Sequence, residues 1–76
     1  MDMTTEVARQ VAAGVVRVMQ DKSISEVQLS EQTGIPRTTL KRRLSGHSAF
    51  NVAELAAIAT VLGVDFALLA AGRDAA

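Results

Sequence analysis

Apolar residues recur at steps of three and four along most of this chain, which is the spacing of an α-helix. The first such stripe predicts a helix over about residues 5–20, with Thr4 or Thr5 able to cap its start. The sequence has no strand-length run of alternating apolar and polar residues. We therefore expect an all-α protein, and the apolar residues of its first helix are Val7, Val11, Val15, Val18 and Met19.

A capping box opens the second expected helix. In the pattern Ser25-x-x-Gln28, each side chain can satisfy a backbone amide of the other residue. The helix is expected to end near Thr33, because Gly34 enters the left-handed conformation without a β-carbon clash. Its apolar contacts are expected from Val27 and Leu29.

The third expected helix is apolar on one side and basic around the rest. It begins at Pro36 or Arg37, where a proline suits the first turn, and Gly46 ends it. Leu40 and Leu44 lie four residues apart and share a face. The polar residues are Arg37, Thr38, Thr39, Lys41, Arg42 and Arg43, with Arg42 opposite the leucines.

Two more helices are predicted in the last third of the chain. Asn51-x-x-Glu54 is a second cap signal, and it opens a helix that Gly63 ends. A short fifth helix follows from Val64-Asp65 to about Ala71. The chain is thus expected to form one domain over residues 1–76, with its core at about 5–71 and a frayed tail at 72–76. The expected buried stripe of the fourth helix is Val52, Leu55, Ile58 or Ala59, and Leu62, and the apolar residues of the fifth are Phe66 and Leu69.

The charges are unevenly distributed although they sum to zero. The chain has 8 lysines and arginines and 8 acids, for a net charge of +0. Between Gln32 and Ala53 every charged residue is basic, so a neutral chain can present one positive face. A basic, threonine-bearing helix on a small helical body suits the DNA major groove, which admits one helix and offers acceptors to arginine and lysine. The alternative is a solvated helix face without a ligand.

Composition narrows the function classes. A chain of 76 residues has room for one domain, and such a domain buries only about 60% of its unfolded surface. The absence of cysteine excludes disulfides and thiolate metal sites and fits a cytoplasmic location. The only aromatic residues, Phe50 and Phe66, are expected in the core or an interface and form no base-stacking platform. We find neither a signal peptide nor an apolar run of the roughly 20 residues that span a membrane.

The residues give little support to catalysis. His47 is the sole histidine, and without cysteines to assist it is more typical of a solvated loop or a phosphate contact than of a metal site. The sequence has no glycine-rich phosphate loop and no nucleophile elbow. We therefore expect a binding protein, not an enzyme, with no cofactor, metal or small-molecule effector.

The order of five short helices, with Gly34 between the second and third, resembles the Cro/C1-type (XRE-like) helix-turn-helix repressors of phages and bacteria. The resemblance spans roughly Val7 to Leu69. Its specific part is LSEQTGIPRTTLKRRLSG followed by FNVAELAAIATVLGV. It implies a small five-helix, lambda-repressor-like domain with Leu29, Gly34, Ile35 and Leu40 at packing positions.

The resemblance and the side-chain chemistry together predict which residues contact DNA. Arginine pairs bidentately with guanine, for about 1–3 kcal/mol of discrimination. The base-contacting candidates are Arg37, Thr38, Thr39 and Arg42; phosphate contact or solvation is the alternative for the arginines, and a structural role for Thr39. The phosphate-contacting candidates are Ser25, Lys41, Arg43, His47, Ser48 and Asn51. Of these, Ser25 and Asn51 also serve as caps, each worth about 1 kcal/mol, at amide-rich helix starts that attract phosphate.

Three positions depart from the family's pattern. Ser30 stands where many members have alanine at the close contact between the two helices. Arg43 occupies a commonly apolar place, so Leu44 is expected to take the core role with the helix rolled by about one position. Glu26 is unusual near phosphate, unless it orients an arginine of the third helix.

The expected function is sequence-specific binding of double-stranded DNA by a Cro-like repressor that inserts helix 36–44 into an operator. The short chain, without an attached effector or oligomerisation domain, favours a phage context. Such regulators usually dimerise on near-palindromic sites. Two alternatives are an antitoxin or anti-repressor that grips a protein, and a DNA-architectural or excision protein. The candidate dimer surface is Phe66, Leu69 and Ala70, which would equally well close the monomer's own core.

Overall fold

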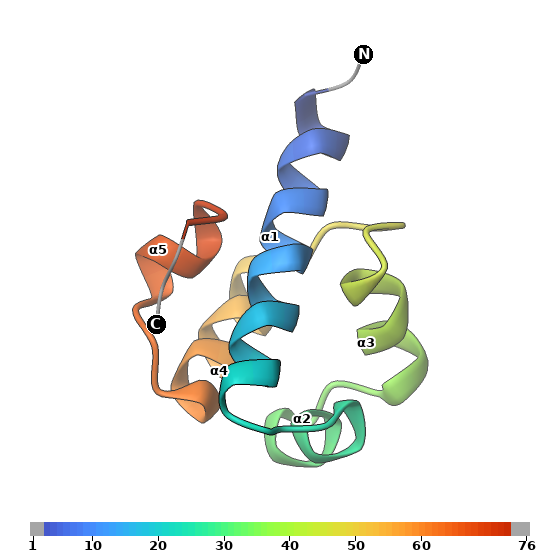
Figure 1. Cartoon of the computed structure of the whole chain (residues 1–76). Helices are drawn as coiled ribbons and strands as arrows, with labels where there is room; N and C mark the ends of the chain where they lie inside the picture. Colours follow the sequence, from blue (N-terminus) through green and yellow to red (C-terminus); the bar gives the residue numbers. More distant parts are fainter. Residues whose placement is uncertain (1–2, 74–76) are drawn as a thin grey trace.

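Five α-helices follow one another along the chain (Figure 1), and the prediction of a small all-α domain is confirmed. The computed structural model describes residues 3–73, a range that contains no strand. Within the same range, none of the helices combines the length and hydropathy needed to cross a bilayer. The helices are α1 (Met3–Asp21), α2 (Glu26–Thr33), α3 (Arg37–Leu44), α4 (Val52–Leu62) and α5 (Phe66–Ala70).

The long helix α1 runs through the middle of the domain, with α3 on one side and α5 on the other (Figure 1). It packs against both of these helices, while α4 packs against α2 and α5. The two short helices α2 and α3 also pack against each other. Each of them is therefore supported by a further helix, α2 by α4 and α3 by α1.

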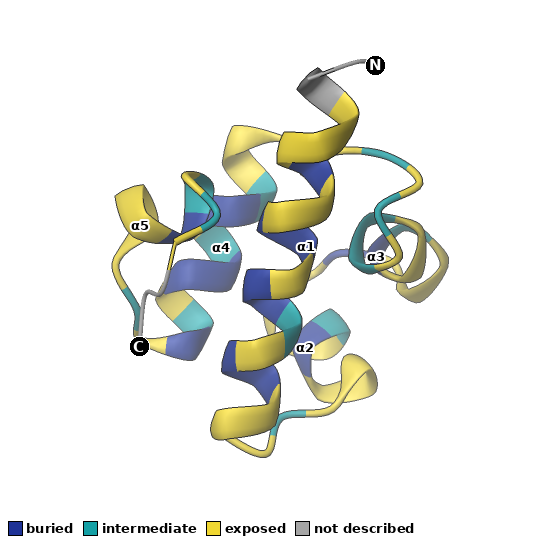
Figure 2. Cartoon of the chain, turned by 45° about the horizontal axis from the view of Figure 1, so that its top comes forward, coloured by how far each residue is buried: buried dark blue, intermediate teal, exposed yellow. Residues whose placement is uncertain are grey.

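Every helix contributes a fully buried apolar residue to one core (Figure 2). Val15, Leu29, Leu40, Ile58 and Leu69, one from each helix in chain order, all have 0% of their surface exposed. No polar or charged residue is buried among the described residues. The short helices α2, α3 and α5 each bury a single residue, so the position of each depends on the contacts that this residue makes with the other helices.

Both predicted capping boxes are confirmed. The Ser25 Oγ accepts from the Gln28 amide at 3.1 Å, and the Ser25 amide donates to Gln28 Oε1 at 2.9 Å. At the start of α4, Asn51 Oδ1 accepts from the Glu54 amide at 2.7 Å, and the Asn51 amide donates to Glu54 Oε1 at 2.9 Å. The two helix starts are thus fixed by residues three apart in the sequence.

The start of the first helix and the burial of the first residue of the apolar stripe in α1 and in α4 were predicted wrongly. α1 begins at Met3, so neither Thr4 nor Thr5 lies outside the helix as a cap. Val7 is 46% exposed because the first turns of α1 project beyond the neighbouring helices (Figure 1). Val52 is 72% exposed, since it directly follows the cap at the solvent end of α4.

The fifth helix is short and capped by Asp65, whose Oδ1 accepts from the Leu68 amide at 3.0 Å. Of the tail expected to fray, residues 72–73 form a turn in which the Arg73 amide donates to the Leu68 carbonyl at 2.9 Å. Residues 74–76 lie outside the described residues.

Candidate nucleic-acid interface

The turn between α2 and α3 is held by side chains as well as by its glycine. Gly34 has φ +80°, a conformation that suits glycine, and its amide donates to the Ser30 carbonyl at 2.9 Å. Thr33 Oγ1 donates to the Leu29 carbonyl at 2.6 Å and accepts from the Ile35 amide at 3.2 Å. Ser30 Oγ donates to the Ile35 carbonyl at 2.6 Å. The serine that departs from the family's pattern therefore bonds across the turn, a role that sequence analysis missed although a hydroxyl so near a turn hinted at it.

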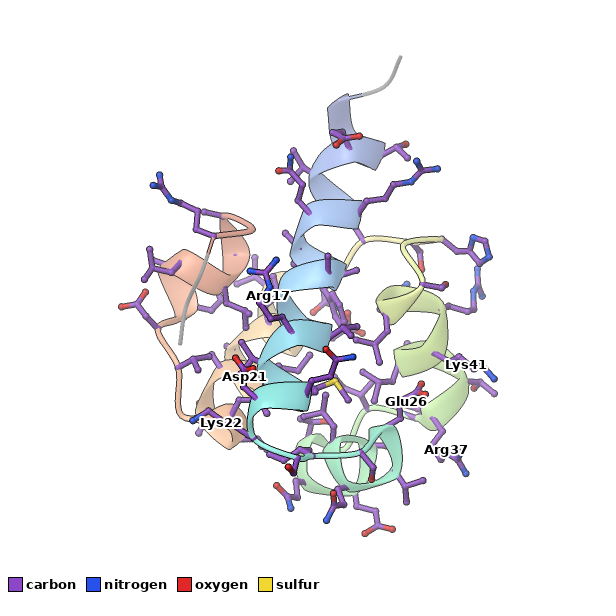
Figure 3. The ribbon with its side chains drawn as sticks, in the orientation of Figure 1. Arg17, Asp21, Lys22, Glu26, Arg37 and Lys41 are labelled. Atoms are coloured by element: carbon purple, nitrogen blue, oxygen red, sulfur yellow. The ribbon has the colours of Figure 1, made fainter. Side chains whose placement is uncertain are left out.

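The helix α3 turns its leucines inward and its basic residues outward. Leu40 is fully buried, and Leu44 is half-buried against the same core. Arg37, Lys41 and Arg42 are exposed, and Figure 3 shows the first two directed away from the body of the domain. The predicted separation of a buried leucine face from an open basic face is confirmed.

The two threonines of α3 differ in exposure. Thr38 is exposed beside the arginines, whereas Thr39 is half-buried. This placement fits Thr38 as a base-contacting candidate and gives weight to a structural role for Thr39.

Arg43, a phosphate-contacting candidate in the sequence, is paired with side chains of the protein itself. Its Nε donates to Glu54 Oε1 at 3.1 Å, and its Nη1 donates to Ser48 Oγ at 2.6 Å. The two charged side chains are only 24% and 14% exposed. Glu54 Oε1 also accepts from the Asn51 amide, so one oxygen joins α3 to the capping box of α4. The position of Arg43 on the inner edge of α3 decides this role.

Replacing Arg43 with alanine is expected to lower the free energy of unfolding by about 1–2 kcal/mol, because two hydrogen bonds to a charged group are lost. Urea unfolding followed by circular dichroism measures this loss. The matched control is Arg42→Ala, which removes an exposed guanidinium from the next residue and should change stability by no more than about 0.5 kcal/mol. Equal stability of the two variants would contradict the pairing.

The loop after α3 is held close to α1. Gly46 has φ +82°, and a β-carbon at this position would lie 3.2 Å from Cγ of Arg9. In the same loop His47 is exposed and Ser48 is half-buried beside Arg43. The loop thus brings His47 and Ser48 to the end of α3, near the start of α4 at Asn51.

The candidate dimer residues do not form one open surface. Leu69 is fully buried and closes the monomer's own core, which is one of the two roles that the sequence left open. Ala70 is half-buried against that core, whereas Phe66 is 38% exposed. The single turn of α5 must cover the core, which leaves only its outer side to a partner.

Two short helices joined at a glycine turn, the second with a buried leucine face and an open basic face, define a helix-turn-helix DNA-binding domain. A helix-turn-helix family model matches residues 16–69, more than half of the chain. The chain belongs to the Cro/C1-type (XRE) helix-turn-helix family and is a DNA-binding transcription regulator of this type. This is a family of DNA-binding regulatory domains and not of enzymes. No significant match was found among curated proteins or solved structures.

Proposed function

We propose that this chain is a Cro-like repressor, which inserts α3 into the major groove of an operator and blocks transcription there. The observation that supports the proposal most is the open face of Arg37, Thr38, Lys41 and Arg42, held outward by the fully buried Leu40. Arginine and lysine side chains find acceptors both on guanine and on the flanking phosphates. The helix α3 has eight residues, follows a hydrogen-bonded turn and is tied to α4 through Arg43, so few groups remain to be ordered when it binds.

The proposed DNA contacts are of two kinds: contacts that read base edges and contacts that position the protein on the phosphates. Base edges are read by side chains from the start and the outer face of α3, and phosphates are bound by a lysine, a loop and two capped helix starts. Phosphate contacts fix the register on the duplex, whereas base contacts select the sequence. The proposed base-reading residues are Arg37, Thr38 and Arg42, and the half-buried Thr39 is left to a structural role. The proposed phosphate-binding residues are Ser25, Lys41, His47, Ser48 and Asn51.

We further propose that two copies bind a near-palindromic operator, in the cytoplasm of a bacterium or of a phage-infected host. Helix-turn-helix regulators usually bind as dimers, with two-fold sites matching the protein's symmetry. The exposed apolar residues of α5, Phe66 and Leu68, offer a small contact for such a pair. Light scattering with and without a selected duplex tests this point, and a one-to-one complex on a full site would reject it.

A salt series of gel shifts tests DNA binding itself, using a duplex selected by the protein from a random pool. Each phosphate neutralised contributes about −0.9 to the slope of log affinity against log salt concentration. The Lys41→Ala variant is expected to bind all sequences more weakly and to flatten this slope by about 1.

The matched control is Lys22→Ala, an exposed lysine that Figure 3 places on the opposite side of the domain from α3. This variant should keep the affinity and the slope of the original chain. Equal binding to selected and random duplexes would reject sequence-specific regulation. A chain that shifts no duplex, and whose interaction with a protein survives the change of Arg37 and Arg42 to alanine, would favour a protein-binding module.

A further inference from the structure

One acidic side chain lies among the cations of the proposed interface. Glu26 is the first residue of α2 and is exposed. It lines a cleft of about 290 Å³ together with Arg37, Thr38 and Lys41 of α3. Figure 3 shows the side chain of Glu26 beside α3, near Lys41 and Arg37. A negative charge is thus built into the face that would meet the DNA backbone.

The same carboxylate also borders a second cleft, between α1 and α3, where Lys41 is again on the rim. Among residues 3–73, no other acidic residue lines either cleft. An acid in the first turn stabilises any helix through its dipole, but that role is independent of what faces the helix. The position of Glu26 in one cleft with two cations of α3 therefore calls for a second explanation.

The physical effect of this acid depends on what Arg37 contacts. When the face rests on an arbitrary sequence, the cations bind phosphates and the carboxylate is repelled by those same phosphates. When Arg37 donates two of its five N–H groups to guanine, others remain free to donate to a carboxylate beside it. The carboxylate of Glu26 thus weakens binding to an arbitrary sequence and supports binding in which Arg37 contacts a guanine.

We propose that Glu26 is a specificity-determining residue of the interface, which weakens binding to arbitrary DNA and positions Arg37 when Arg37 is bound to a base. The inference rests on the proposed function, since it presupposes that α3 enters the major groove. It adds a repulsive element to the attractive contacts, which is a common way for interfaces to discriminate between partners.

The test compares Glu26→Gln with the original chain by fluorescence anisotropy, on the selected duplex and on a scrambled duplex of equal composition. Removing one repulsive charge near a phosphate is expected to tighten binding to the scrambled duplex by about fivefold. Binding to the selected duplex should weaken, because Arg37 loses the carboxylate that positions it, so the ratio of the two affinities should fall by more than about fivefold. Repeating the selection with the variant should flatten the preference at one base position.

The matched control is Glu31→Gln, which removes the same charge from an exposed residue of α2 that lines neither cleft. Its affinity ratio should stay within about twofold of the original chain. Equal effects of the two variants would show a general effect of net charge and overturn the proposal. An unchanged ratio for Glu26→Gln would overturn it too.

A double-mutant cycle with Arg37→Ala isolates the positioning role. If Glu26 acts through Arg37, the variant Glu26→Gln should no longer weaken binding to the selected duplex once Arg37 is gone. An undiminished loss in that background would overturn the coupling. A preference of the original chain for its selected duplex, measured in the same experiment, separates these outcomes from failure of the proposed function. If the original chain prefers no duplex, the proposed function fails and this inference fails with it.

Discussion

The Arg42→Ala variant is expected to bind the selected duplex about 10- to 100-fold more weakly than the original chain, while its binding to random duplexes falls far less. Arg42 is exposed on the side of α3 opposite its leucines, where a bidentate contact with guanine is available. Loss of such a contact removes discrimination at one base pair and leaves the phosphate contacts in place. Anisotropy titrations on both duplexes, at one fixed salt concentration, measure the difference.

The matched control is Arg17→Ala, which removes an equal charge from an exposed residue of α1 on a side that Figure 3 shows turned away from α3. This control should retain the preference for the selected duplex. If Arg42→Ala weakens both duplexes to the same degree, Arg42 contacts phosphate rather than a base. If it weakens neither, the exposed basic face is not the DNA-binding surface.

The Leu40→Ala variant is expected to lose about 2–5 kcal/mol of stability, the usual cost of truncating a fully buried leucine. A domain of this size has only about 5–10 kcal/mol in total, so a measurable fraction of the variant should be unfolded at room temperature. Leu40 is the residue of α3 that is completely buried, and its loss detaches the helix from the core. Thermal and urea unfolding followed by circular dichroism measure the effect.

The comparison for this prediction is Leu68→Ala, which truncates the same side chain where it is 39% exposed. Its cost should be below about 1 kcal/mol, because little apolar surface is returned to water. Similar melting of the two variants would mean that α3 is not anchored by Leu40. The outward direction of its arginines would then have no structural basis.

Local patterns in the sequence predicted much of this architecture. The capping boxes at Ser25 and Asn51 and the glycines at positions 34 and 63 all marked helix boundaries that the structure confirms. These features act over three or four residues, through hydrogen bonds and backbone conformation that need no distant partner. The leucine spacing in α3 was sufficient in the same way to predict which side of that helix is buried.

Other features depended on neighbours that the sequence does not reveal. Val7 and Val52 continue apolar stripes but lie beyond the reach of the other helices, so both are exposed. Leu69 was as plausible in a dimer interface as in the core until the packing of α5 on α1 and α4 placed it inside. Periodicity predicts the direction of a side chain around its own helix, but it does not predict whether another helix packs against that side chain.

The sequence by itself thus determined the helices, their caps and the face of α3 that carries its cations, because these depend on the nearest few residues. Only the tertiary structure decided which cations are free. It tied Arg43 to Glu54 across the loop while leaving Arg37, Lys41 and Arg42 open. It also placed Glu26 beside two of those cations, eleven and fifteen residues further along the chain. An ion's effect depends on distance in space, and only the packing of α2, α3 and α4 sets those distances.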